Sequence, residues 1–95
     1  MAPEAFDWDE GNTEKNWNKH RVNAKECEQI FLNIPLVTLQ DTKHSDRENR
    51  FILLGKTNQG RLLHVVCTMR GKSIRVISAR DQNKKERRRY EQEKK

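Results

Sequence analysis

The stretch RFILLGKTNQGRLLHVVCTMRGKSIRVISAR, residues 50–80, determines the fold class of this chain. Runs rich in Ile, Leu and Val occupy 50–56, 61–69 and 73–80, and such runs are typical of strands. They are separated by Asn58-Gln59-Gly60 and by Arg70-Gly71-Lys72, which both suit hairpin turns. The stretch therefore predicts three antiparallel strands joined as a meander.

The residues before the meander predict a further strand and a helix. Leu36, Val37 and Leu39 follow Pro35 and favour a strand. The segment 23–26, Asn-Ala-Lys-Glu, has the form of a capping box and predicts a helix over about 24–32, which Pro35 ends.

The N-terminal part predicts a first helix after an extended segment. Phe6 and Trp8 lie at period-2 spacing within Ala5–Asp9, which indicates a short strand or an extended lead-in. Asp9 is suited to cap a helix that runs to about His20. Trp8 is expected to be mainly structural.

The polar stretch 41–49 predicts a loop, and the C-terminus predicts a basic helix. Asn83 and Glu86 repeat the capping-box form, and Tyr90 is the clear apolar anchor of the helix that follows. Since 33% of the 95 residues are hydrophobic and 36% are charged, one modest core is expected. We predict a single α+β domain over 1–95, with its core over about 5–82 and the helix over about 83–95.

The charge favours a polyanionic partner. Twenty Lys and Arg against 14 Asp and Glu give a formal net charge of +6. The first 14 residues contain five acids and no Lys or Arg, so the rest of the chain is more basic and a polyanion is expected to meet it there.

The cysteine and glycine patterns predict neither a metal nor a cofactor. Cys27 and Cys67 lie in separate apolar segments and are expected to be buried free thiols. The chain has no Cys-x-x-Cys, no His-x-x-x-His and no phosphate-binding glycine loop, which argues against kinases, NTPases and dehydrogenases. With no apolar run near the roughly 18 residues of a membrane span and no signal-peptide pattern, a cytoplasmic location is expected.

Many short motifs follow one another in a familiar order. They are Phe6-Asp-Trp8-Asp9, Asn16, Lys19-His20, Asp41-x-x-His44-Ser45-x-x-Glu48-x-Arg50, Gly60-Arg61-Leu-Leu, Val65-Val-x-Thr68-x-Arg70, Ile74-Arg75-Val-Ile-Ser78-Ala79-Arg80 and Glu86-Arg87-Arg-x-x-Tyr90. This series resembles the BrnT family, the toxin halves of a type II toxin–antitoxin system. The resemblance covers the chain from about Phe6 to Tyr90, and its specificity lies in the order and spacing of the motifs. One departure is Arg21, which stands where the family commonly has Gly. Gly after a helix end suits a left-handed backbone, so either Arg21 is strained or the turn differs.

The resemblance implies a fold, an activity and a partner. The implied fold is RelE-like, with two N-terminal helices on one face of a twisted antiparallel sheet of about four strands and the other face left for RNA. The implied activity is a metal-independent endoribonuclease that inhibits growth by cutting RNA through the ribose 2′-OH. The implied partner is a BrnA-like antitoxin that resembles a ribbon-helix-helix DNA-binding protein and forms a heterotetramer with the toxin, which represses its own operon.

Such cleavage needs a base, an acid and a cation near the phosphate. Arg80, where the last strand turns into the terminal helix, is the first candidate for phosphate stabilisation; the alternative is pairing with Asp81 or Asp41. Arg75 is a second candidate, although strict alternation along the strand would put it on the opposite face from Arg80 unless a bulge intervenes.

The candidates for proton transfer are histidines and a glutamate. His20, beside Lys19 at a helix end, is either an acid or a helix cap. His44 and Glu48 are either an acid–base pair held over the sheet by Arg50 or a solvated ion pair. His64, within an apolar strand, is expected to be packed rather than catalytic. Lys19, Arg50 and Arg70 are expected to bind RNA.

Two other functions fit the same sequence. A ParE-like toxin shares the fold and acts by binding a protein such as DNA gyrase, in which case the acid–base residues are dispensable. A non-catalytic basic RNA-binding module is supported by charge alone and predicts binding that weakens with salt, without cleavage.

Overall fold

The computed structural model describes residues 5–8, 10–40 and 49–93. The elements are β1 (Ala5–Phe6), α1 (Glu10–His20), α2 (Ala24–Gln29), the 3-10 helix η1 (Ile30–Leu32), β2 (Val37–Gln40), β3 (Arg50–Lys56), β4 (Leu62–Arg70), β5 (Ser73–Asp81) and α3 (Lys84–Glu93). The three predicted strands of the meander are confirmed to within one residue at each end. No helix of these described ranges has the length and apolarity needed to cross a membrane.

The sheet differs from the prediction in its number of strands and in one direction. Its order is β1-β5-β4-β3-β2, and β2 to β5 pair antiparallel as expected. The short β1 adds a fifth strand that runs parallel to β5, with Ala5 beside Ser73 and Phe6 beside Ile74. The predicted antiparallel sheet of about four strands is therefore confirmed for β2 to β5, and the parallel β1 is the difference. A two-residue strand has too little periodicity to reveal its partner, and packing of Phe6 against the core decides where it lies.

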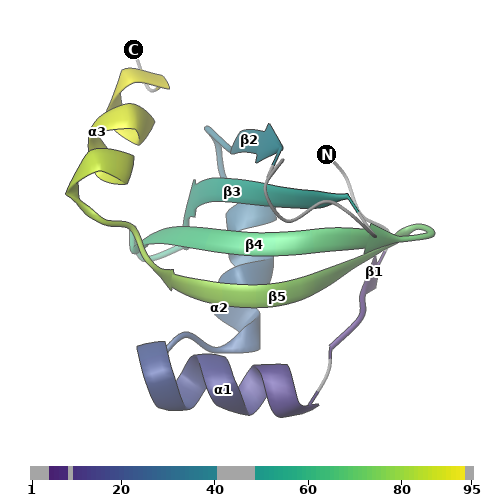
Figure 1. Ribbon diagram of the computed structural model, residues 1–95. Coiled ribbons are helices and arrows are strands. Elements are labelled where there is room, and N and C mark those ends of the chain that lie inside the picture. Colours follow the sequence, from purple (N-terminus) through teal and green to yellow (C-terminus); the bar gives the residue numbers. More distant parts are fainter. Residues whose placement is uncertain (1–4, 9, 41–48, 94–95) are drawn as a thin grey trace.

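Both N-terminal helices cover one face of this sheet. In Figure 1, α2 passes behind the strands and α1 lies along β5, so neither of these helices covers the face turned to the viewer. The predicted capping box opens α2: the Glu26 amide donates to Asn23 Oδ1 at 2.8 Å, and the Asn23 amide donates to Glu26 Oε1 at 3.1 Å. The helix ends in η1, before the cis peptide bond of Pro35.

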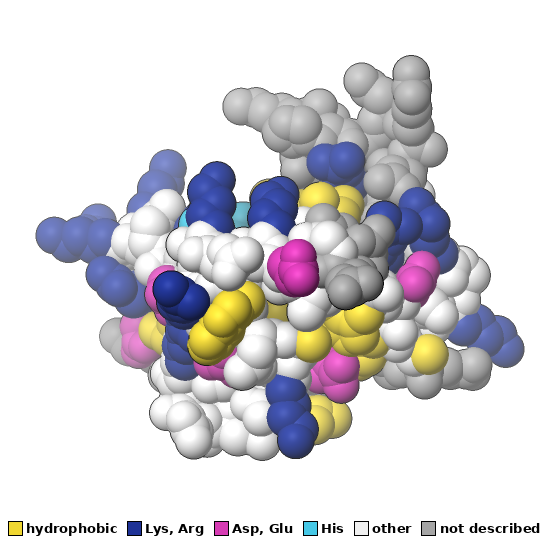
Figure 2. Space-filling model, turned by 90° about the horizontal axis from the view of Figure 1, so that it is seen from below, with side chains coloured by type: hydrophobic (Ala, Val, Ile, Leu, Met, Phe, Trp, Pro, Cys, Tyr) yellow, Lys and Arg dark blue, Asp and Glu magenta, His cyan; other side chains and the backbone are white. Residues whose placement is uncertain are grey.

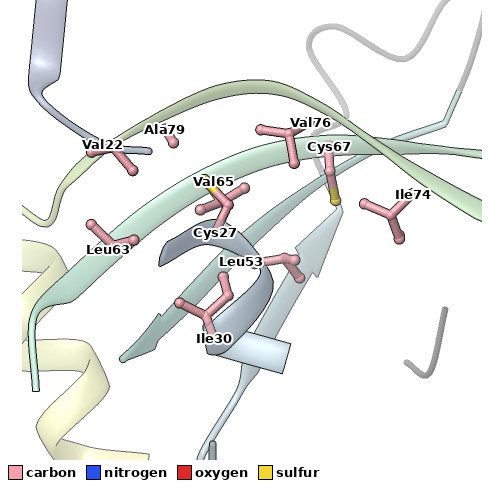
Figure 3. Close-up of a cluster of buried hydrophobic side chains, with 10 residues drawn as sticks. All are labelled: Val22, Cys27, Ile30, Leu53, Leu63, Val65, Cys67, Ile74, Val76 and Ala79. Carbon is pink, nitrogen blue, oxygen red and sulfur yellow. The ribbon is translucent and has the colours of Figure 1, made fainter. Parts of the chain in front are cut away.

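The main core lies between these helices and the sheet. Figure 3 shows Val22, Cys27 and Ile30 facing side chains of β3, β4 and β5. Cys27 and Cys67 are buried free thiols, as predicted, and burial raises the pKa of each to about 12. Trp8 packs on the edge of this core and its Nε1 donates to Glu28 at 2.8 Å, which is the structural role expected of it.

The turn after α1 explains the sequence departure at Arg21. The first helix ends at His20 as predicted, and Arg21 has a left-handed backbone with φ of 55°. Its amide donates to the Trp17 carbonyl at 2.9 Å, and its guanidinium lies 5.4 Å from the Trp17 ring. The expected cap, Asp9, lies outside the described residues.

The C-terminal helix packs on the other face of the sheet. Tyr90 is fully buried beside Val37 and Leu54, and its hydroxyl donates to the Pro35 carbonyl at 2.6 Å. Because Leu53 belongs to the main core and its neighbour Leu54 to this second cluster, the two clusters lie on opposite faces. α3 thus covers one end of the face that α1 and α2 leave free, which we call the open face.

Candidate functional site

A bulge in β5 sets the orientation of the two candidate arginines. Val76 pairs with Cys67, but the next β4 residue, Val66, pairs with Ser78, so Ile77 has no partner in the register. On either side of this bulge, Val76 and Ala79 both join the main core.

The bulge reverses the alternation along the strand at Ile77. Arg75 and Arg80 consequently lie on the same side of the sheet, the open face. Strict alternation along β5 would place Arg75 and Arg80 on opposite faces. The unpaired Ile77 interrupts this alternation, so that placement does not hold.

Cross-strand pairs arrange the open face in rows. Directly paired residues point to the same side of a sheet. Arg50 pairs with Thr68, which pairs with Arg75, and we call this the Thr68 row.

The second row lies nearer to α3. Leu54 pairs with His64, which pairs with Arg80, and we call this the His64 row. Thr68 and His64 are four positions apart on β4, about 13 Å along the strand. Arg75 and Arg80 therefore lie on one face but in separate rows.

The His64 row is completed by Glu86 from α3. Nη1 and Nη2 of Arg80 donate to the two Glu86 oxygens, each at 2.9 Å. Nε2 of His64 lies 3.4 Å from Glu86 Oε2. Burial opposes ionisation of Glu86 and would raise its pKa. Hydrogen bonds from Arg80 and the Asn83 backbone, with the charge interactions of Glu86 with His64 and Arg80, outweigh burial, so the pKa of Glu86 lies below its ordinary value.

The position of Glu86 is set by the start of α3. Its amide donates to Asn83 Oδ1 and its Oε1 accepts from the Asn83 amide, both at 2.9 Å, which is the predicted capping box. The sequence pattern assigned Glu86 to the cap alone. Its proximity to His64 depends on the β4–β5 register, which no local pattern contains.

His20 and Lys19 lie away from these rows. The His20 carbonyl accepts from Arg61, whose guanidinium also binds Asp81. Asp81 follows Ala79 by two residues and shares its side of the sheet, the side of the helices. The structure therefore does not bring His20 to Arg80, and Arg61 takes the place beside Asp81 that was the alternative for Arg80.

The remaining candidates are spread over the open face or outside the described residues. Arg50 belongs to the Thr68 row, and Arg70, two residues beyond Thr68, is exposed on the same side at the end of β4. His44 and Glu48 lie outside the described residues. In Figure 2, several Lys and Arg side chains project along the upper margin, the side of the open face, and others lie lower, among the Asp and Glu side chains.

A groove of about 540 Å³ runs between the open face and α3. We call it the α3 groove. Its lining comprises Leu39, Ile52 and Leu54 on the sheet, Lys85, Arg88, Arg89 and Gln92 on the helix, and His64, Asn83 and Glu86 at the base of α3. The groove therefore joins an apolar floor to a basic wall and reaches the His64 row.

A family model described as the ribonuclease toxin BrnT of a type II toxin–antitoxin system matches residues 8–86. No curated protein matches. The matched segment contains both rows of the open face and ends at Glu86, so the site lies within the part that is similar to the family.

Proposed function

The chain belongs to the BrnT family, the ribonuclease toxins of type II toxin–antitoxin systems, and from this premise we propose that it cuts RNA on the open face by activating the ribose 2′-OH without a metal ion. The observation that carries the proposal is the β5 bulge, since it sets Arg75, Arg80 and His64 on one surface. A toxin of this family has RNA targets and a cognate antitoxin.

The reaction needs no group beyond the protein and the RNA. The 2′-oxygen forms a bond to the adjacent phosphorus and gives its proton to a base, while the bond from phosphorus to the 5′-oxygen breaks. An acid donates a proton to that 5′-oxygen. The products are a 2′,3′-cyclic phosphate and a 5′-hydroxyl, and cations stabilise the charge that develops on the phosphoryl oxygens.

The rows suggest a division of these roles. We assign phosphate stabilisation to Arg75 and Arg80 and RNA backbone binding to Arg50. His64 was expected from the sequence to be packed, but because it lies beside Arg80 and Glu86 on the open face we assign proton transfer to it. Glu86 is a positioning residue that holds both side chains.

Five candidates from the sequence remain part of the proposal. His44 and Glu48 precede Arg50 in the chain and stay candidates for acid and base. His20, on the helix side, stays a second candidate donor, and Lys19 and Arg70 stay candidates for RNA binding outside the rows.

Cleavage by the purified protein in EDTA tests the mechanism. We expect RNA fragments that carry 2′,3′-cyclic phosphate, and no cleavage at a nucleotide whose 2′-OH is replaced by hydrogen. Activity that a chelator abolishes, or that persists at the 2′-deoxy position, would overturn the proposal.

Single substitutions test the residues. Arg75→Ala, Arg80→Ala and His64→Ala should each lower kcat/KM for RNA by about 100-fold or more, in line with the loss of one acid–base or charge-stabilising group. Lys25→Ala, an exposed change on α2, is the matched control and should leave it unchanged. His20→Ala and His44→Ala measured beside them identify the second proton-transfer group. Growth inhibition that survives all of these changes would instead favour a toxin that acts by binding a protein.

The antitoxin is proposed to be a ribbon-helix-helix protein that forms a heterotetramer with the toxin in the cytoplasm. The mass of the purified complex by analytical ultracentrifugation tests the assembly, and a mass equal to one copy of each chain would exclude it.

A further inference from the structure

The α3 groove combines apolar and cationic surfaces that the cleavage mechanism does not use. Leu39, Ile52 and Leu54 form its floor. On α3, Lys85, Arg88, Arg89 and Gln92 follow at i, i+3, i+4 and i+7 and so form one helical face. The sheet side of the groove is therefore apolar, and the α3 side presents a row of three cations.

The lining favours a polypeptide over RNA as the occupant. Single-stranded RNA binds to proteins largely by stacking its bases on aromatic side chains. None of the described residues that line the groove is Phe, Tyr or Trp, and its floor is aliphatic. Aliphatic floors flanked by charges are typical of grooves that receive amphipathic segments of partner proteins.

The charges specify the chemistry of that segment. Lys85, Arg88 and Arg89 attract carboxylates, and the acid that lines the groove, Glu86, already accepts two hydrogen bonds from Arg80. A partner with Asp or Glu beside its apolar side chains would complement this wall.

We propose that the α3 groove is the docking site of the cognate antitoxin, and that it receives an acidic amphipathic segment of that protein. The proposal rests on the antitoxin partner of the family and not on how RNA is cut. His64 lines the groove beside Arg80, so a docked segment covers the His64 row. An antitoxin segment bound in the α3 groove then keeps RNA away from His64 and Arg80.

A charge-reversal pair on one helix tests the docking site. The double variant Arg88→Glu/Arg89→Glu changes the groove wall, and Lys84→Glu/Arg87→Glu makes the same change of charge at exposed positions of α3 that do not line the groove. The probe is the purified full-length antitoxin encoded with this toxin, titrated by calorimetry at fixed ionic strength. We expect Kd to rise at least tenfold for the groove variant and less than threefold for the control.

A floor variant and an RNA probe complete the test. Leu39→Ala should also weaken antitoxin binding, whereas Thr38→Ala, an exposed change next to it, should not. Thermal unfolding of each variant is followed by far-UV circular dichroism. Only variants whose unfolding midpoint equals that of the parent protein are compared. Equal losses for the two charge reversals would overturn the proposal, because net charge would then explain binding. The proposal would also be overturned if the groove variants bound the antitoxin as before but bound 2′-O-methylated RNA more weakly. The groove would then be an RNA-binding site. Since neither titration requires cleavage, a failure here is distinct from a failure of the mechanism.

Discussion

At the scale of single residues, Arg61 connects the two N-terminal helices to the sheet. Its guanidinium donates to the two carboxylate oxygens of Asp81 at 2.7 and 3.1 Å and to Glu26 at 3.1 Å. It also donates to the carbonyls of His20 and Arg21 at the end of α1. These hydrogen bonds hold the pKa of Asp81 below its ordinary value. One side chain thus ties the ends of α1 and β5 to the start of α2.

Replacing Arg61 should therefore destabilise the fold. We expect Arg61→Ala to lower the free energy of unfolding by about 2–3 kcal/mol, since two carboxylates and two carbonyls lose the hydrogen bonds that Arg61 donates to them. Arg61→Lys should recover only part of this loss, because an ammonium cannot reproduce the planar fork. Urea denaturation measures both, with the exposed Arg70→Ala as control. A loss no larger than that of Arg70→Ala would contradict this role.

Arg21 offers a second test at the residue scale. A side chain at φ of 55° costs about 1–2 kcal/mol that glycine does not incur. Arg21→Ala keeps this strain and loses the contact with Trp17, whereas Arg21→Gly removes both. Arg21→Gly should therefore be more stable than Arg21→Ala by about 1 kcal/mol in the same denaturation experiment. Equal stabilities would mean that the turn rearranges.

At the scale of elements, the β5 bulge decides which side chains share the open face. Deleting Ile77 removes the residue that has no partner, so the pairs on both sides keep their register and their faces. We expect this deletion to fold cooperatively, at a cost of about 1–2 kcal/mol for the lost half-buried side chain.

The matched control for the bulge is a deletion of Val66 from β4. That strand has no spare residue, so the deletion turns one half of the strand over and exposes core side chains. Thermal unfolding followed by circular dichroism should show a transition for the Ile77 deletion and none for the Val66 deletion. Unfolding of both would show that the bulge is required for folding.

At the scale of the whole molecule, the free energy of unfolding should decrease both as pH falls on the acid side and as pH rises on the alkaline side, which we call the acid limb and the alkaline limb. The pKa values of Asp81 and Glu86 are lowered in the folded state, so the unfolded chain takes up protons first as pH falls. Their contribution is present above the ordinary carboxyl range and is lost below about pH 4 to 4.5. Asp81→Asn should flatten this limb.

The alkaline limb comes from the two buried thiols. Burial raises the pKa of Cys27 and Cys67 from the ordinary value of 9.0 to about 12, so the unfolded chain loses these protons first as pH rises. The stabilising contribution is complete below pH 9.0 and is lost between there and about 12. Free energies of unfolding measured in urea across this range should decline less steeply for Cys67→Ala, and an equal slope would contradict this assignment.

Local patterns predicted most of the elements because their causes are local. The capping boxes at Asn23 and Asn83 each depend on residues three positions apart, and the structure forms both. The resemblance also pointed to an unusual backbone at Arg21, which has the left-handed conformation that glycine would adopt. The extended segment at Ala5 was predicted, but its parallel pairing with β5 was not, because a two-residue strand contains no signal for its partner.

The candidate site was predictable in its residue types but not in its geometry. Arg75 and Arg80 follow from the need for cations near a phosphate, yet their common face depends on Ile77. Glu86 was assigned to a helix cap alone, although it also pairs with Arg80.

The sequence by itself determined which segments become strands and helices, where they begin and end, and that the two thiols are buried, since these depend on neighbours along the chain. Only the tertiary structure decided that Arg75, Arg80 and His64 share one surface and that Glu86 joins them. The physical reason is that a side chain's face beyond a bulge follows the register of the partner strand, which is set by packing between distant segments.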